Sequence, residues 1–231
     1  MAFTILHPAP GRIRGVLFDM DGVILDSEKL YVKFWMEACA LFGHSMNYPQ
    51  ALGMRSLNAE AGQRYLSGLF GPEISYSVVR EKRIALMDTY VAKHGIAPKP
   101  GIYELLDYLQ EQGIPYAITT ASPIDRVQEH LGRVVLLLRF PILCSARQVP
   151  HGKPEPDIYL FGAKNLNLPP ESCLALEDSQ AGILSAHRAG CKATIVPDLD
   201  QPNESTLAIA YAKADSLTDV IELIKTHNGK S

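Results

Sequence analysis

The stretch that decides the fold is Arg-Gly-Val-Leu-Phe-Asp-Met-Asp-Gly-Val-Ile-Leu-Asp-Ser-Glu, residues 14–28. Its apolar run at residues 16–18 is typical of a strand buried on both faces, because the apolar residues are consecutive rather than alternating. Asp19 and Asp21 follow this run, and Gly22 after Asp21 predicts a turn. We therefore expect two carboxylates at the carboxyl edge of a sheet, where open α/β sheets bind ligands.

Two carboxylates held this close repel each other, so one of them must take a proton or find a cation. That property suits a metal site, and it also suits a nucleophile paired with a general acid and base. The simpler alternative is an ordinary Asp-Gly turn, since Asp-x-Asp-Gly arises by chance in about one chain in twenty of this length. The strand context and further polar partners have to decide between them.

Composition limits the class of protein. The chain has 231 residues, enough for one larger and one smaller domain, and its net charge of −3 gives no sign of a nucleic-acid or membrane partner. The first ten residues do not resemble a signal peptide, and no apolar run approaches the ~18 residues of a membrane span. We expect a cytoplasmic monomer. The four cysteines lack any C-x-x-C spacing, which favours buried free thiols: Cys39, Cys144, Cys173 and Cys191.

The order of elements along the chain predicts the fold class. Residues 28–96 show helical periodicity only, with helices expected at about 28–43, 58–70 and 77–94. After the stiff connection at residues 97–101, strands and helices alternate, which indicates a parallel sheet with helices on both faces. We predict an α/β fold, with a core domain of residues 1–27 and 97–231 and an inserted helical cap domain of residues 28–96 that covers the carboxyl edge. Residues 1–12 are interpreted as a proline-containing lead-in. Further strands are expected at about 115–120, 142–144, 172–176 and 193–196, and further helices at about 102–112, 124–131, 155–166, 180–189 and 217–225.

Three more polar clusters follow expected strands, at residues 119–122, 152–157 and 177–179. In a parallel sheet they would converge on the edge that carries Asp19. Four carboxylates there would suit Mg²⁺, a hydroxyl would hold phosphoryl oxygens, and an ammonium would offset the acids. Taken singly, the hydroxyl is more simply a strand-end residue, the ammonium a solvated loop lysine and the acids part of a helix cap. The residues meant are Asp19, Asp21, Glu177 and Asp178 as acids, Thr120 as hydroxyl and Lys153 as ammonium.

The motifs resemble those of the haloacid dehalogenase superfamily, in the branch of small phosphatases and β-phosphoglucomutase-like proteins. The resemblance covers about residues 13–198, and the four motifs occur in the family's order and spacing. Residues 18–23 match motif I, with Asp26-Ser27-Glu28 continuing the branch's pattern, while Thr120 fits motif II, Lys153 motif III and residues 177–182 motif IV.

The resemblance implies a Rossmann-like core with a helical cap inserted after motif I. It also implies that Asp19 attacks phosphorus and forms an aspartyl-phosphate, and that Asp21 protonates the leaving oxygen and then helps to activate water. Mg²⁺ would lie between Asp19, the backbone carbonyl of Asp21 and Asp178, with Glu177 ligating directly or through water. The phosphoryl group would be bound by Thr120, the amide of Ala121, and Lys153.

The same comparison separates related activities. Dehalogenases and phosphonatases of the superfamily lack the second acid of motif I, and Asp21 is present here. A phosphomutase shares all four motifs, but the histidine that assists β-phosphoglucomutase on the first cap helix corresponds to Tyr31 in this chain, which favours hydrolysis. Tyr31 would line the substrate pocket or, equally, pack as an aromatic residue in the core of the cap.

Substrate choice is expected to come from the cap. The turn at residues 52–56 resembles the family's substrate-specificity loop, with Gly53 and Arg55 as candidate substrate contacts, although a solvated loop arginine is the simpler interpretation. Ser122, beside motif II, is a further candidate. We expect a Mg²⁺-dependent phosphatase for a small phosphorylated metabolite, a sugar phosphate or nucleotide. The alternatives are a phosphohexomutase of the same fold and a non-catalytic protein that binds a phosphorylated ligand.

Overall fold

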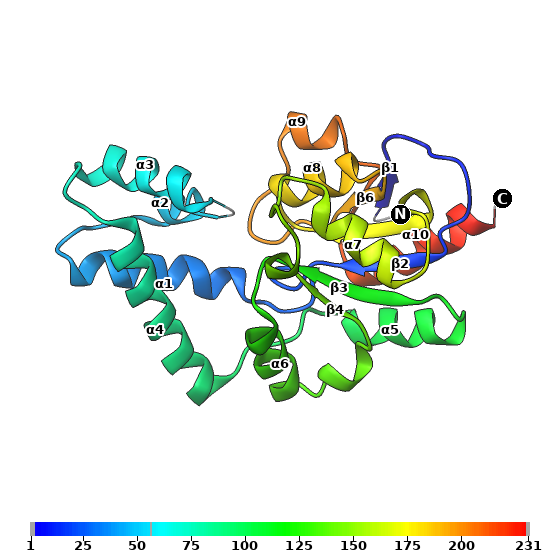
Figure 1. Ribbon diagram of the computed structural model, residues 1–231, viewed down its shortest axis with the longest axis horizontal. Helices are drawn as coiled ribbons and strands as arrows, with labels where there is room; N and C mark the ends of the chain where they lie inside the picture. The colour runs from blue at the N-terminus through cyan, green and yellow to red at the C-terminus, as the bar shows by residue number, and fades with distance from the viewer. Residues whose placement is uncertain (1–2, 56, 230–231) are drawn as a thin grey trace. The chain divides into compact units, whose positions relative to one another are not determined.

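The chain forms two compact units in the computed structural model, which describes residues 3–55 and 57–229 (Figure 1). The larger unit runs up to Asp26 and resumes at Ala97, and the smaller unit is Ser27–Ile96. Ser56, the last residue of the expected specificity loop, lies outside the described residues, as do the first two residues of the expected lead-in.

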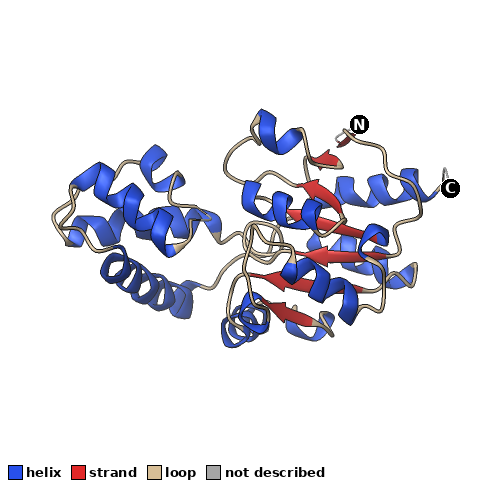
Figure 2. Cartoon of the chain, turned by 45° about the horizontal axis from the view of Figure 1, so that its top comes forward, coloured by secondary structure: helices blue, strands red, loops and turns tan. Residues whose placement is uncertain are grey.

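The larger unit is built on a seven-stranded sheet with the order β1-β7-β6-β5-β2-β3-β4 (Figure 2). β1 runs antiparallel to β7, and every other pairing is parallel. The α/β class predicted from the alternating pattern is confirmed. The strands are β1 Phe3–Ile5, β2 Gly15–Phe18, β3 Tyr116–Thr120, β4 Leu143–Ser145, β5 Cys173–Glu177, β6 Lys192–Ile195 and β7 Ala212–Ala214.

Helices lie on both faces of this sheet (Figures 1 and 2). β2 and β5 are buried along their whole length, as expected for strands covered on both sides. The α-helices are α5 Ile102–Glu111, α6 Ile124–Arg133, α7 Asp157–Asn165, α8 Gln180–Arg188, α9 Glu204–Leu207 and α10 Leu217–Asn228, and the short 3₁₀ turns are Leu137–Arg139, Ala146–Gln148 and Pro170–Ser172.

The register of the sheet brings three strand ends together. Phe18, the last residue of β2, pairs with Leu176 of β5 on one side and Ile118 of β3 on the other. The backbone N–H of Asp19 then donates to the carbonyl of Leu176 at 3.0 Å, which extends the pairing by one bond. Parallel strands end at the same edge, so the residues that follow each of these strands share one edge of the sheet.

The interpretation of residues 1–12 as a lead-in is wrong for Phe3–Ile5, because these residues form the strand β1. Phe3 pairs with Ala214, and Ile5 with Ala212, so this segment closes one edge of the sheet against β7. Both strands are three residues long. A run this short has no measurable alternation, and its strand character comes from the pairing itself.

The smaller unit contains helices and no strand among its described residues. The helices are α1 Glu28–Leu41, α2 Tyr48–Leu52, α3 Ala59–Phe70 and α4 Tyr76–His94. α1 packs along α4, where Trp35 stacks on Tyr76 at 5.5 Å between ring centres. The short α2 is not foreseen by the apolar pattern, since it depends on a capping box in which Asn47 and Gln50 bond each other's backbone N–H groups.

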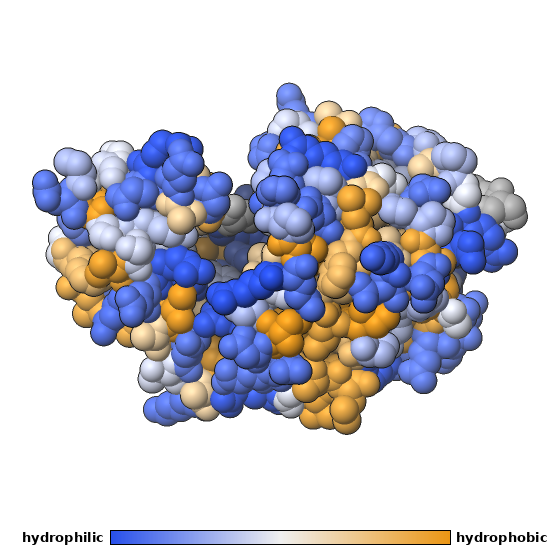
Figure 3. All heavy atoms as spheres, viewed as in Figure 1, coloured by the Kyte–Doolittle hydropathy of each residue, from blue (hydrophilic) through white to orange (hydrophobic). Residues whose placement is uncertain are grey.

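No helix among the described residues is both long and apolar enough to cross a membrane. Polar and apolar residues mix over the face of the molecule shown in Figure 3, with an apolar area near α5 and α6. In the turn after α6, Val135 is 77% exposed and Leu138 is 93% exposed. The expected monomeric state remains a prediction, and this turn is where an association between chains would have apolar surface to cover.

We predict that the four cysteines do not react in the folded protein. All four are free and buried, and burial raises the pKa of the Cys39, Cys144 and Cys173 thiols to about 11 and that of Cys191 further still. The thiolate is the reactive form, so little of it exists at pH 8. Titration with a chromogenic disulfide reagent should give no fast-reacting thiol in buffer and four in denaturant. A thiol that reacts within seconds in the native protein would contradict the burial described here.

Candidate active site

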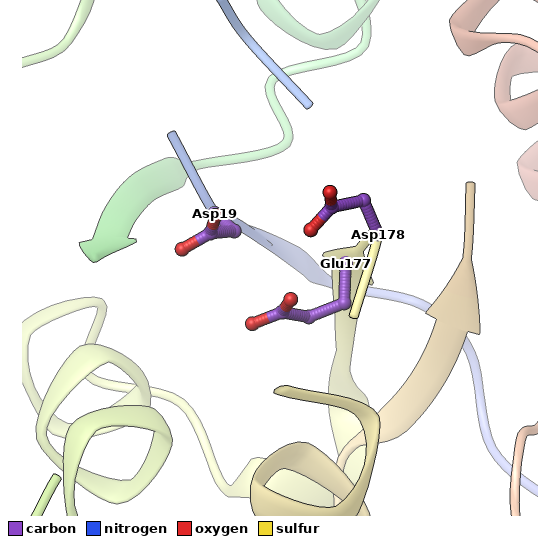
Figure 4. Close-up of side chains that lie close together, drawn as sticks. All are labelled: Asp19, Glu177 and Asp178. Carbon is purple, nitrogen blue, oxygen red and sulfur yellow. The ribbon is translucent and has the colours of Figure 1, made fainter. Parts of the chain in front are cut away.

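Three carboxylates gather at the carboxyl edge of the sheet. Asp19 follows β2, Glu177 is the last residue of β5, and Asp178 comes next; Figure 4 shows that the three side chains lie close together. One carboxylate oxygen of each lies within 4.8 Å of the others. Glu177 is fully buried and Asp19 is 7% exposed. Such a group of buried acids requires protons or cations to offset its charge.

Lys153 supplies one of these charges. It lies in the connection between β4 and α7, and its Nζ is 2.5 Å from Asp19 Oδ1 and 2.5 Å from Glu177 Oε1. The ammonium also donates to the backbone carbonyl of Thr119 at 3.2 Å. Its side chain is only 10% exposed. The simpler interpretation, a solvated loop lysine, is therefore wrong.

The electrostatics of the pair follow from this burial. Desolvation raises the pKa of Asp19 to about 8, against the attraction of Lys153, and the nearby Glu177 and Asp21 add to the rise. Burial alone would lower the pKa of Lys153, but the attraction of Asp19 and Glu177 outweighs it and raises the pKa above its usual value. The lysine is charged at neutral pH, and a second cation at this cluster would lower the pKa of Asp19 again.

Glu177 is held by hydrogen bonds on both of its oxygens. The hydroxyl of Tyr159, in α7, donates to Oε1 at 2.5 Å, and the hydroxyl of Ser179 donates to Oε2 at 3.2 Å. Ser179 is also the N-cap of α8, because its Oγ accepts the N–H of Gly182 at 3.1 Å. Residues 177–179 therefore do both: Ser179 caps α8, while Glu177 and Asp178 belong to the acidic cluster. Burial raises the pKa of Tyr159 well above its usual range, so its hydroxyl remains a donor.

Asp21 lies in a second, adjoining network. The hydroxyl of Ser122 donates to Asp21 Oδ2 at 3.0 Å, and the N–H of Ser122 donates to Thr120 Oγ1 at 3.1 Å. The hydroxyl of Ser145, at the end of β4, donates to the carbonyl of Ser122 at 2.7 Å. Thr120 is buried and Ala121 is exposed. Ser122, expected as a substrate contact, thus contacts Asp21.

The three-acid cluster fits a divalent metal such as Mg²⁺. It offers hard oxygen ligands, and its buried Asp19 would lose its proton to a cation. Asp19 and Asp178 are the residues that would hold the ion. Both oxygens of Glu177 already accept bonds from protein groups, which favours contact with the ion through water. The side chain of Asp21 is not a member of this cluster, in agreement with a role for its backbone carbonyl alone.

Three of the expected substrate contacts belong to the smaller unit: Tyr31, Gly53 and Arg55. Arg55 Nε lies 2.7 Å from Glu28 Oε2, with side chains only 10% and 14% exposed, so a solvated arginine is wrong. The ring of Tyr31 lies 4.8 Å from the guanidinium carbon of Arg83. Gly53 lies so close to the Tyr65 hydroxyl that a Cβ would overlap it. All three are packed within their own unit.

Two residues of the site are missed by the sequence analysis. Tyr159 lies in the first turn of α7, where an aromatic residue predicts only a core contact. Gly182 lies within motif IV but carries no chemistry; a Cβ at this position would overlap the carboxyl group of Glu177. The spacing of Glu177, Ser179 and Gly182 is the only signal in the sequence for this contact, and it reads first as a helix cap.

Comparisons with known proteins agree on one family. The sequence model described as haloacid dehalogenase-like hydrolase matches residues 16–196. Hexitol phosphatase A of Escherichia coli (strain K12) is 31% identical over 203 residues, which cover 86% of this chain and 91% of that protein.

Two solved structures show the same fold. A HAD family hydrolase from Deinococcus radiodurans R1, with bound phosphate and sodium, is 26% identical with a TM-score of 0.76, covering 94% of this chain and 97% of that one. β-Phosphoglucomutase from Clostridium difficile is 24% identical with a TM-score of 0.75, covering 94% and 98%. The hexitol phosphatase lies in the branch of small phosphatases identified from the motifs, and the mutase, at 24% identity, shows the shared fold.

We predict that Gly182→Ala lowers stability by roughly 1–3 kcal/mol, because the new methyl group must displace a carboxylate that Tyr159 and Lys153 hold in place. Gly132→Ala in α6 is the matched control, since nothing lies within 4 Å of its added Cβ. That change should raise stability by about 0.4–1 kcal/mol. Urea unfolding of both variants checks the pair. Equal stability of the two would mean that Glu177 is not confined as described.

Proposed function

Because the chain belongs to the haloacid dehalogenase-like hydrolase family, we propose that it is a Mg²⁺-dependent phosphatase of a small phosphorylated metabolite, a sugar phosphate or a nucleotide. Phosphoric monoester hydrolysis is supported by the hexitol phosphatase relative and by the related hydrolase with bound phosphate. The observation that carries the proposal is the placement of Asp19 against Lys153 in a buried cluster of acids. An anionic nucleophile, an ammonium and hard oxygen ligands together suit phosphoryl transfer.

The proposed first half of the reaction transfers the phosphoryl group to the protein. A carboxylate oxygen of Asp19 forms a bond to phosphorus while the bond to the leaving oxygen breaks, and Asp21 gives that oxygen its proton. Lys153 holds Asp19 Oδ1 at 2.5 Å and so limits the rotation of the nucleophile. The hydroxyl of Ser122 donates to Asp21 Oδ2 and so helps to orient the carboxyl group of the proposed acid.

The second half returns the site to its starting state. Asp21, now ionised, takes a proton from water as the water oxygen bonds to phosphorus and the bond to Asp19 breaks. The backbone N–H of Ala121 and the region of Thr120 would hold phosphoryl oxygens during both steps, as amides beyond a strand end commonly do. A divalent ion held by Asp19 and Asp178 would supply positive charge to those oxygens.

We predict that the purified protein releases phosphate only with Mg²⁺ and that Asp19→Asn lowers kcat by at least about 10³-fold, because the amide is a poor nucleophile. The assay should measure inorganic phosphate from hexitol phosphates, hexose phosphates and nucleoside monophosphates, with Mg²⁺ or with EDTA. Asp107→Asn is the control, since this exposed acid pairs with Arg139 on the surface of the larger unit. Retained turnover in Asp19→Asn would refute the covalent role.

Product analysis in the same assay separates the alternatives. Free phosphate from several phosphorylated sugars supports the phosphatase. Migration of the phosphoryl group on a hexose phosphate, without release of phosphate, would show that the protein is a phosphohexomutase instead. Saturable binding of these compounds with no turnover, in the presence of Mg²⁺, would replace it with a ligand-binding protein.

We further predict that the affinity for Mg²⁺ rises with pH. In the metal-free protein burial raises the pKa of Asp19 to about 8, so below that pH an arriving ion must displace a proton. Affinity should therefore increase by roughly tenfold per pH unit up to about 8 and then level off. Calorimetric titration with MgCl₂ at pH 6, 7, 8 and 9 measures this. An affinity that is flat across the series, or as steep in Asp19→Asn, would contradict it.

A further inference from the structure

Tyr159 is the group in the acidic cluster to which the proposed reaction gives no role. It is fully buried in α7, and its hydroxyl donates to Glu177 Oε1 at 2.5 Å. The same oxygen lies 2.5 Å from Lys153 Nζ, and this ammonium reaches Asp19 Oδ1 at the same distance. The three contacts form a chain from the tyrosine hydroxyl to the proposed nucleophile.

We propose that Tyr159 is a positioning residue for phosphoryl transfer: its hydroxyl fixes Glu177, and through Glu177 it keeps Lys153 shared between two carboxylates. The proposal rests on the phosphatase function proposed above. Tyr159 itself contacts none of the groups that react, so its effect on Asp19 passes through Glu177 and Lys153.

The geometry explains why the hydroxyl matters. Glu177 Oε2 is bonded by Ser179, and Gly182 lies directly against the carboxyl group, so that group has little room to turn. Tyr159 shares the remaining oxygen, Oε1, with Lys153. Without the hydroxyl, the full charge of that oxygen would draw Lys153 toward Glu177 and away from Asp19, because a buried carboxylate binds its remaining donor more strongly.

Two consequences should follow at the metal site. Asp19 would lose part of the contact that fixes its orientation, and the carboxylate of Glu177 would shift within a cluster whose oxygens now lie within 4.8 Å of one another. Groups that bond to the ligands of a metal usually change its affinity by about 10- to 100-fold when they are removed. We therefore expect losses of roughly tenfold both in Mg²⁺ affinity and in kcat, with KM within about twofold of the wild-type value, because the substrate's non-reacting part is not contacted.

Tyr159→Phe is the variant that tests this, since it keeps the ring and removes only the hydroxyl. The contact of Lys153 with the ring, 5.4 Å from its centre, is retained. Tyr211→Phe is the matched control: Tyr211 is also buried in the larger unit, and its hydroxyl forms a 2.7 Å hydrogen bond with His227 Nδ1. Both changes remove one buried tyrosine hydroxyl from the larger unit, so a general effect of losing such a group would appear in both variants.

The experiment titrates MgCl₂ into the metal-free full-length wild type and both variants by calorimetry, and measures kcat, KM and the melting temperature of each. The expected result is weaker Mg²⁺ binding and lower kcat in Tyr159→Phe alone, with comparable melting temperatures in the two variants. If Tyr159→Phe matches Tyr211→Phe in Mg²⁺ affinity and in kcat, the positioning role is overturned, even though the wild type is a phosphatase.

The Mg²⁺ titration distinguishes a failure of this inference from a failure of the proposed function. If the wild type hydrolyses no phosphate ester but binds Mg²⁺, and Tyr159→Phe weakens that binding, the phosphatase proposal fails while the action of Tyr159 on the acidic cluster stands. A wild-type protein that binds no Mg²⁺ at millimolar concentration would overturn both.

Discussion

The buried ammonium of Lys153 is the interaction on which the site depends. Its Nζ lies 2.5 Å from oxygens of both Asp19 and Glu177, and Asp178 adds a third acid to the same cluster. One positive charge cannot balance three carboxylates, so the cluster keeps an excess of negative charge. Removing the lysine would leave buried charges without compensation, which is far more costly than losing an exposed ion pair. The remaining imbalance is what gives the cluster its affinity for a further cation.

The parallel sheet brings these residues together from distant parts of the chain. Asp19 follows β2, Glu177 ends β5 and Lys153 lies beyond β4, while β3 supplies the carbonyl of Thr119 to the ammonium. These four strands are neighbours in the order β5-β2-β3-β4. The pairing of Phe18 with Leu176 and Ile118 fixes the level at which β2 ends relative to its neighbours. A slip of one residue would turn Asp19 to the other face of the sheet and separate it from Lys153.

The site residues that could be predicted from the sequence are those that follow buried strands. Asp19, Glu177 and Lys153 could be assigned to one edge because consecutive apolar residues mark buried parallel strands, and polar residues after such strands share an edge. The edge strands β1 and β7 could not be predicted, since three residues show no alternation and their pairing is a tertiary contact. Side-chain partners were the other gap. That Ser122 bonds Asp21, or that Arg55 pairs with Glu28, depends on distances across the fold that no spacing in the sequence encodes.

The proposed reacting groups and the expected cap residues lie in different units. Every group that the proposed reaction uses lies in the larger unit, where Lys153 donates to Asp19 and Ser122 donates to Asp21. Tyr31, Gly53 and Arg55 lie in the smaller unit, and there Arg55 is already neutralised by Glu28. Because both side chains are largely buried, separating this ion pair would leave uncompensated charge, so it fixes Arg55 within the smaller unit.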